Sequence, residues 1–442
     1  MLAKLGSHFL IIIIIIFQYF AILIHFLPSV SPALFLLSSF DLRFLSIHSS
    51  FMDSSAMPSS QSPEHELIAE SVTARLISED VEQLEIMSSE EKYYKIWSNA
   101  AKAWIVSFPE ERGNDFIQLL SSAAGLSGLT QLRFFPEQLE LQELDELCRS
   151  LSSNETLKRL TMLGSWKHAG HCTGDVAKCI SEVLTATASL DYLHFESWVV
   201  DSAAMEHIAS ALAANNTLHF LHFYWVKVSK EGMQHIAQIL QTNSSLKSLI
   251  MLGGGIDSAS AGLVAEGIGH NSSLEILDLI DNPLGSEGMV SLATALKPNT
   301  SLRELLLGDR KQGIGSHGAS AIAELLRSNP TLKKLVIVND ATMSAEDIVQ
   351  IAKAIQKESC LQHLDASSCH GVAGEAVAAA LVDALSRCEG LKEVQFRRTP
   401  LEREGVADEL KRLLRLRSGE SHVEDQTDQV TPVRLECICP PF

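Results

Sequence analysis

One short leucine pattern recurs ten times along the chain and limits its fold more than any other feature. In the clearest example, Leu274, Leu277 and Leu279 form L-x-x-L-x-L. The same pattern begins at Leu129, Leu157, Leu190, Leu218, Leu246, Leu302, Leu332, Leu361 and Leu391, at intervals of 28 to 33 residues. A fixed period of this kind is typical of a solenoid, in which each repeat packs against its two neighbours.

Each repeat contains the signals of one strand and one helix. Around the leucines, apolar and polar residues alternate, as in a short strand with one buried face. The second half places Met289, Leu292, Ala293 and Leu296 at helical spacing, so that one helix face is apolar. Parallel strands need a crossover connection, which the helix supplies. The sequence therefore predicts an α/β solenoid of about ten repeats over residues 126–417.

An asparagine precedes the first leucine by three residues in six repeats. These residues are Asn154, Asn215, Asn243, Asn271, Asn299 and Asn329. Because asparagine tolerates the left-handed conformation that ends many helices, we expect it to end these helices in that way. Five of the six also match the N-x-S/T glycosylation pattern, but their recurrence at one structural position favours the structural interpretation.

The repeat from Leu274 to Ser301 resembles the ribonuclease-inhibitor-like class of leucine-rich repeats. This class includes ribonuclease inhibitor, the Ran GTPase-activating protein and the sensor arms of NOD-like receptors. The resemblance implies a curved horseshoe with a parallel sheet on its concave face, helices on its convex face and, in most members, intracellular residence. The class places Asn or Cys eight residues after the first leucine. Asn282 and Cys369 fit, but most repeats differ, so irregular turns are expected, especially between Leu190 and Gly255.

Charge and motifs restrict the function. The net charge of −19 would repel phosphate backbones, so we expect no nucleic acid and a protein partner with a neutral or basic surface. The sequence GxxxxGKS/T is absent, which excludes the nucleotide-binding domain of a NOD-like receptor. Catalytic motifs such as HExxH are also absent, so we expect no enzyme activity and no cofactor.

An insertion in the second repeat contains His168, His171 and Cys172. A metal site needs three or four ligands held in a fixed geometry. We therefore interpret the insertion as a surface loop and expect no metal.

The candidate binding site lies on the outward-facing strand positions of the third and fourth repeats. The predicted protein-binding residues are Tyr192, His194, Phe220, His222, Tyr224 and Trp225. In a concave face they would form an exposed aromatic patch, and aromatic residues dominate the energetics of many interfaces. Alternatively, Trp198, Trp225 and Val226 fill the turns that lack the usual asparagine.

The rest of the concave face is expected to change character along the array. The next outward positions are apolar: Ile250, Leu252, Ile276, Ile280, Leu306, Val336 and Val338. A large exposed apolar surface would mark an interaction surface. The last two repeats carry polar and charged residues there, which predicts a solvated rim.

The ends of the chain differ from the repeats. Residues 9–27 are uncharged and long enough to span a bilayer, so residues 1–51 are a signal anchor, a mis-assigned start before Met52 or a cleaved signal peptide. We expect a disordered linker over 52–65, a helical N-terminal cap over 66–125 around Trp97 and Trp104, and a polar C-terminal tail over 418–442. Residues 52–147 contain no cysteine. Secreted leucine-rich-repeat proteins usually close this end with disulfides, so the absence of cysteine favours a cytoplasmic protein.

Three functional hypotheses follow. The first is a non-enzymatic scaffold that binds a protein partner on the concave face. The second, taken from the resemblance, is a regulator of a small GTPase of the GTPase-activating type. The third is a membrane-anchored receptor-like protein, which requires that residues 9–27 are retained.

Overall fold

The computed structural model describes residues 81–88, 92–98, 103–107, 129–134, 136, 141–164, 170–403 and 412. The chain divides into two units, Met1–Glu66 and Leu67–Phe442, and all these residues belong to the second. The predictions for residues 1–51, 52–65 and 418–442 lie outside the described residues. Within the described part, none of the helices is both long and apolar enough to cross a bilayer.

Ten parallel strands, one from each predicted repeat, form a continuous sheet in the described part of the chain. They are β4 (Gln131–Phe134), β5 (Arg159–Leu163), β7 (Tyr192–Glu196), β9 (Phe220–Tyr224), β11 (Ser248–Leu252), β12 (Ile276–Asp278), β13 (Glu304–Leu307), β14 (Lys334–Ile337), β15 (His363–Asp365) and β16 (Glu393–Gln395). Equivalent repeat positions pair across neighbouring strands, as Leu277 does with Leu305. The predicted register is therefore confirmed.

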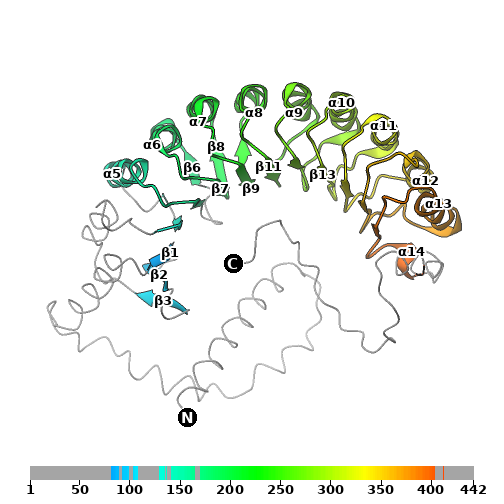
Figure 1. Cartoon of the computed structure of the whole chain (residues 1–442), viewed down its shortest axis with the longest axis horizontal. Helices are drawn as coiled ribbons and strands as arrows, with labels where there is room; N and C mark the ends of the chain where they lie inside the picture. The colour runs from blue at the N-terminus through cyan, green and yellow to red at the C-terminus, as the bar shows by residue number, and fades with distance from the viewer. Residues whose placement is uncertain are drawn as a thin grey trace, which may run out of the picture. The chain divides into compact units, whose positions relative to one another are not determined.

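The helices line the convex side of this arc and the strands line its concave side (Figure 1). The helices are α5 (Leu141–Ser152), α6 (Gly174–Ala186), α7 (Ser202–Ala214), α8 (Lys230–Thr242), α9 (Ser258–His270), α10 (Gly285–Leu296), α11 (Gly315–Ser328), α12 (Ala345–Ala354), α13 (Gly374–Arg387) and α14 (Pro400–Arg403). The α/β repeat solenoid predicted from the sequence is confirmed.

A single hydrophobic core lies between the helices and the sheet. Leu277 of β12 and Met289, Leu292 and Ala293 of α10 are all 0% exposed. The alanine in each helical stripe has a small side chain, so the helix packs close to the strands. The sequence pattern thus gives the core directly, because each repeat contributes equivalent residues.

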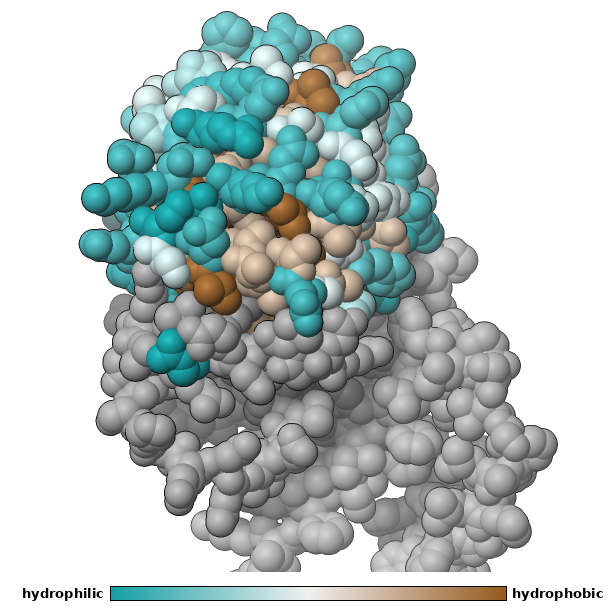
Figure 2. Space-filling view, turned by 90° about the vertical axis from the view of Figure 1, so that its right-hand side faces the viewer, coloured by the Kyte–Doolittle hydropathy of each residue, from teal (hydrophilic) through white to brown (hydrophobic). Residues whose placement is uncertain are grey.

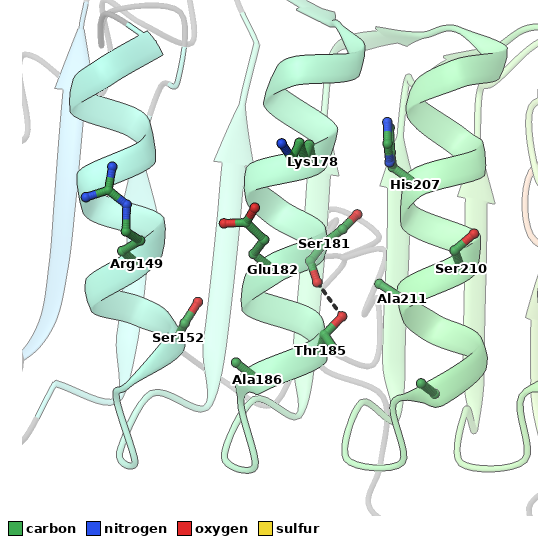
Figure 3. Close-up of a pocket in the computed structure, with 11 residues that line it drawn as sticks. Arg149, Ser152, Lys178, Ser181, Glu182, Thr185, Ala186, His207, Ser210 and Ala211 are labelled. Carbon is green, nitrogen blue, oxygen red and sulfur yellow. Dashed lines mark hydrogen bonds between the residues drawn. The ribbon is translucent and has the colours of Figure 1, made fainter.

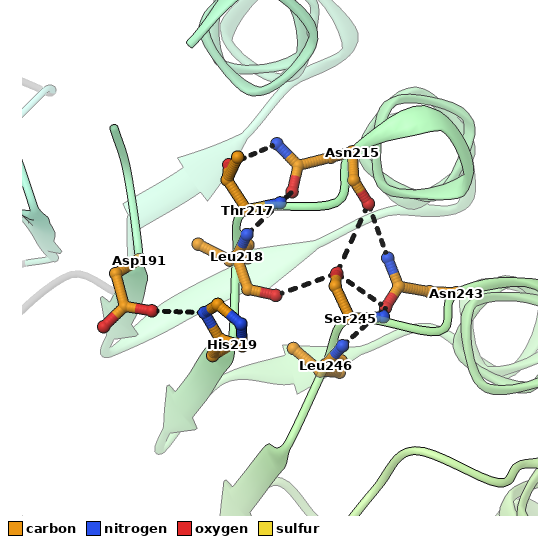
Figure 4. A network of polar contacts seen from close by, with 8 residues as sticks. All are labelled: Asp191, Asn215, Thr217, Leu218, His219, Asn243, Ser245 and Leu246. Atoms are coloured by element: carbon orange, nitrogen blue, oxygen red, sulfur yellow. Dashed lines mark hydrogen bonds and ion pairs between the residues drawn. The ribbon is translucent and has the colours of Figure 1, made fainter. Parts of the chain in front are cut away.

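The asparagines that recur before the first leucine of the repeats form a hydrogen-bond ladder between repeats (Figure 4). Asn215 ends α7 with φ −79° and ψ 132°, which is extended and not left-handed. Its Oδ1 accepts hydrogen bonds from the backbone N–H of Thr217 at 3.1 Å and of Leu218 at 2.8 Å. Its Nδ2 donates to the backbone oxygen of Leu184, in the preceding repeat, at 2.6 Å. The left-handed conformation expected at Asn215 is therefore wrong. The side chain, not a left-handed backbone, makes the hydrogen bonds that connect the end of the helix to the next strand and to the preceding repeat.

The same arrangement continues along the array. Asn243 accepts from Ser245 and Leu246 and donates to the backbone oxygens of Leu212 and Asn215. The ladder residues Asn215, Asn243, Asn271, Asn299 and Asn329 are 5–8% exposed. Buried amides with all their hydrogen bonds made are structural residues, which supports the structural interpretation of the glycosylation-like pattern.

The irregular turns form a second small sheet. Its parallel strands are β6 (Gly170–Cys172), β8 (Trp198–Val200) and β10 (Lys227–Val228). Trp198 and Val226 are each 1% exposed, and Trp198 Nε1 donates to the backbone oxygen of Met162 at 3.1 Å. In the later repeat Asn282 accepts from the N–H of Ile256 instead. The turn-filling interpretation therefore holds for Trp198 and Val226.

The expected helical cap over residues 66–125 is wrong for the segments that the structure describes. They form β1 (Val81–Ser88), β2 (Lys92–Ser98) and β3 (Ala103–Ser107). β1 pairs in parallel with β4 and antiparallel with β2, which in turn pairs with β3. These segments are rich in Tyr, Trp, Ile and Val, which favour strands. The added strands pair the backbone groups of β4 that a sheet edge would leave open.

The C-terminal end of the array has a mainly hydrophilic surface with small separate apolar patches (Figure 2). α14 closes this end: Leu401 is 0% exposed, and its backbone N–H donates to the oxygen of Val372 at 3.0 Å. A polar outer face is typical of a terminal repeat.

Candidate interaction site on the concave face

The sheet register aligns outward-facing residues of successive repeats in rows. One row contains Arg159, Tyr192, Phe220, Ser248, Ile276, Glu304, Lys334, His363 and Glu393. The next contains Arg133, Thr161, His194, His222, Ile250, Asp278, Leu306, Val336, Asp365 and Gln395. Neighbouring strands lie about 4.8 Å apart, so side chains within a row contact one another.

Five of the six predicted binding residues form one group, here named the aromatic cluster. They are Tyr192, His194, Phe220, His222 and Tyr224. The ring centroids of Tyr192 and His222 are 4.8 Å apart, and those of His194 and Tyr224 are 4.6 Å apart. The Tyr192 hydroxyl lies 3.1 Å from His194 Nδ1, within hydrogen-bond distance. The structure therefore brings these residues together as the alternation predicts.

The aromatic cluster is less exposed than expected. Tyr192 is 6% exposed and His222 is 1% exposed, while His194, Phe220 and Tyr224 are half-buried. The guanidinium carbon of Arg159 lies 4.1 Å from the centre of the Tyr192 ring and covers it. Ser248 Oγ lies 3.4 Å from His222 Nε2. Tyr192 and His222 thus form a floor, and the other three residues form the accessible part.

The apolar stretch that follows is also more buried than expected. Ile250, Ile280 and Val336 are 5–6% exposed, whereas Leu252, Ile276, Leu306 and Val338 are half-buried. On the inner side of a curved sheet, side chains of adjacent strands converge and cover one another. The broad exposed apolar surface predicted here is therefore only partly present.

Trp225, the sixth predicted residue, lies just beyond β9 and is 45% exposed. Its backbone has φ 56°, a left-handed value that is uncommon for a bulky residue and costs on the order of 1–3 kcal/mol. The indole packs over Gly253: a Cβ on that glycine would lie 2.3 Å from Trp225 Cε3. The turn therefore presents Trp225 to solvent beside Tyr224, so the turn-filling interpretation does not hold for this residue.

Burial keeps both histidines of the aromatic cluster uncharged. The pKa of His194 is lowered to about 3, mainly by burial and then by the charges of Arg133 and Arg159. Burial, His194 and Arg159 lower the pKa of His222 to about 3. At neutral pH the positive charge of this region therefore comes from the two arginines.

Sequence reasoning missed these two arginines. Arg159 in the second repeat occupies the outward position that Tyr192 occupies in the third. Arg133 in the first repeat occupies the position of His194. Arg133 lies 3.7 Å from Glu196, whose pKa is raised by burial and partly lowered again by Arg133. Extending the alternation rule to every repeat would have included both residues.

A hollow lies on the convex side, between α5, α6 and α7 (Figure 3). Its volume is about 670 Å³, and its lining consists of Arg149, Ser152, Lys178, Ser181, Glu182, Thr185, Ala186, His207, Ser210, Ala211 and Ala214. This lining mixes small and charged side chains, and it contains no aromatic residue except a single histidine. The composition of this lining is typical of an ordinary surface between helices, unlike that of the concave face.

The insertion in the second repeat is described only in part. His168 lies outside the described residues, and Cys172 is 2% exposed. Burial raises the pKa of the Cys172 thiol to about 12, which disfavours the thiolate that binds metals. Among the residues that the structure describes, no group of three or more His, Cys, Asp or Glu side chains is placed to hold a metal ion.

The fold and this site define an α/β repeat solenoid with aromatic residues on its concave face. Over 109 residues the chain is 32% identical to a curated relative, Protein TORNADO 1 of Arabidopsis thaliana. The match covers 25% of this chain and 8% of the relative's length, so the similarity is local. No family model matches the chain.

Proposed function

We propose that this protein is a non-enzymatic, ribonuclease-inhibitor-like leucine-rich-repeat scaffold that binds a protein partner on its concave face. The observation that carries the proposal is the aromatic cluster, together with the 45% exposed Trp225 beside it. Interfaces obtain most of their binding energy from a few residues, among which Trp, Tyr and Arg are enriched. Here all three types meet on adjacent strands.

The rigid setting of the site also supports binding. The aromatic cluster lies on β7 and β9, whose inward residues Leu193, Phe195, Leu221 and Phe223 are 0% exposed. Because these strands are fixed by the core, little conformational freedom is lost on association. A prearranged surface of this kind suits recognition of a folded or extended partner.

The charge of the whole chain favours a partner with a neutral or basic surface. At a net charge of −19, long-range attraction would increase the association rate of a basic protein and reduce that of nucleic acid. The net charge thus affects how fast the whole partner approaches, whereas the aromatic cluster makes the local contacts in the complex.

Replacing the most accessible aromatic residues tests the proposal. A partner is first captured from the native cell with the full chain, and Tyr224→Ala with Trp225→Ala is then compared with the wild type. We expect binding at least about tenfold weaker, since a hot-spot residue contributes about 2 kcal/mol or more. The melting temperature should change little, because Trp225 is exposed and Tyr224 is half-buried.

Val290→Ala is the matched control, since Val290 is 40% exposed on helix α10 of the convex side. It should leave both binding and melting temperature unchanged. A large loss of stability in the double variant would instead identify Tyr224 and Trp225 as core residues, and the proposed site would be wrong.

The two other hypotheses have their own measurements. A regulator of small GTPases would accelerate GTP hydrolysis across a panel of such proteins, and lack of acceleration would remove that hypothesis. A membrane-anchored receptor requires that the mass of the native intact chain includes residues 9–27.

A further inference from the structure

We propose that the concave site binds an extended peptide segment of the partner in which a carboxylate lies next to an apolar side chain. Arg159 would bind the carboxylate, Phe220 would contact the apolar side chain beside it, and Tyr224 and Trp225 would contact residues further along the peptide. This inference rests on the proposed function and specifies the chemistry of the partner at the same site.

Arg159 differs from the other cations of the two rows, which are paired with carboxylates. Arg133 pairs with Glu196 at 3.7 Å and Lys334 with Glu304 at 3.4 Å. His363 pairs with Glu393 at 2.8 Å. Among the described residues Arg159 has no carboxylate partner, and its guanidinium lies on the Tyr192 ring. The charge of Arg159 is thus available to a ligand.

The Tyr192 ring holds the Arg159 guanidinium in one orientation. A guanidinium placed over an aromatic face is fixed in orientation, and its planar set of N–H donors matches a carboxylate in a bidentate pair. Arg159 is half-buried, so its interaction with an anion is weakened less by water than that of an exposed cation. Tyr192 therefore prepares Arg159 for an anion.

Both histidines of the aromatic cluster have one ring nitrogen without a hydrogen bond to the described residues. His194 Nε2 and His222 Nδ1 are buried, and neither has a hydrogen-bond partner in the part of the chain that the structure describes. Buried polar atoms of this kind are usually satisfied, so a ligand with donors and acceptors near them would gain binding energy. The backbone amides of an extended peptide provide such groups at regular intervals.

The accessible aromatic residues indicate that the ligand carries an apolar side chain in addition to the carboxylate. Phe220 lies next to Tyr192 in the same row, and Tyr224 and Trp225 follow at the end of β9. Phe220 is the nearest of them to Arg159, because its ring centroid lies 6.4 Å from that of Tyr192, over which Arg159 lies. An acidic residue beside Leu, Phe or Trp in the partner would contact Arg159 and Phe220 at once, and the extended chain would continue along β9 toward Tyr224 and Trp225.

The probe for this inference is a random-peptide phage library selected on the purified full chain. We expect the selected peptides to contain Asp or Glu next to an apolar residue. Binding of one synthetic selected peptide is then measured for the wild type, Arg159→Gln and Arg159→Lys. We expect at least tenfold weaker binding for Arg159→Gln, and partial recovery for Arg159→Lys, which keeps the charge without the planar fork.

Two controls sharpen this test. Arg397→Gln removes an exposed arginine at the far end of the array and should leave the affinity unchanged. Comparing free and amidated C-termini of the same peptide, with and without its acidic residue, shows whether a side-chain or a terminal carboxylate binds. The affinity should also decrease with salt for the wild type and much less for Arg159→Gln.

The outcomes separate this inference from the proposed function. Selected peptides without acidic residues, no selected peptides, or full affinity for Arg159→Gln would overturn the inference. If Tyr224→Ala with Trp225→Ala still abolishes partner binding in that case, the proposed function stands. If neither set of substitutions affects binding of the captured partner, both are wrong.

Discussion

The seventh residue after the first leucine adopts a left-handed backbone in most repeats. Its φ lies between 56° and 67° at Ser197, Trp225, Gly253, Asp281, Asn339, Ser368 and Arg398. This is the turn that follows each strand, so the chain reverses there whatever residue occupies it. In one repeat the position is used to expose Trp225, and the next repeat accommodates its indole with Gly253.

A single buried carboxylate gives the clearest pH dependence. Asp278 is 6% exposed, and burial raises its pKa from 3.8 to about 6. The folded-state pKa of Asp278 is above its unfolded-state value, so ionising this buried carboxyl lowers the free energy of unfolding. This loss is absent below about pH 4 and develops as the pH rises through 6. Asp278→Asn should therefore stabilise the protein by roughly 2–3 kcal/mol at pH 8 and by little at pH 4.

Urea unfolding at both pH values measures this effect. Asp365→Asn, in the same row but half-buried, is the control for the loss of a carboxylate from the concave face. An equal effect of Asp278→Asn at pH 4 and pH 8 would show that burial does not raise the pKa of Asp278 in the folded state.

The orientation of concave residues could be predicted from sequence, but their exposure could not. Strict alternation gave the outward direction of Tyr192 and His222. Their burial depends on Arg159 and Ser248, which belong to neighbouring repeats. Such contacts require the register of the sheet, which a pattern within one repeat does not contain.

At the scale of elements, the asparagine ladder explains how adjacent repeats are held in register. Asn215 joins the end of α7 to the strand that follows and to the preceding repeat. The sequence showed that the position recurs, but its mechanism depends on contacts 31 residues away. The same limit applies to β1–β3, where helical spacing was inferred in segments that instead extend the sheet.

Two adjacent asparagines allow a matched test of the ladder. Asn215→Ala would leave the N–H of Leu218 and the oxygen of Leu184 without these bonds, each loss costing about 1–3 kcal/mol in a buried position. We expect a decrease in the free energy of unfolding of roughly 2–4 kcal/mol. Asn216→Ala, at an exposed position, should change it by less than about 0.5 kcal/mol. Equal effects from both would mean that the ladder does not stabilise the array.

At the scale of the whole array, the residues that stabilise the fold differ from those proposed to bind the partner. The core and the asparagine ladder repeat along its length, so each repeat depends on its neighbours. The aromatic cluster and Arg159 occur in only a few adjacent repeats, which is why we propose that one region of the concave face binds the partner. A substitution there should affect binding more than folding.

Site-specific photocrosslinking tests the central claim, concave-face recognition, most directly. A photoreactive phenylalanine analogue replaces Phe220 on the concave face or Ser210 at the convex hollow, in the full chain with its captured partner. We predict a covalent adduct with the partner from position 220 and none from position 210. An adduct from position 210 alone would place recognition on the helices and contradict the proposed function.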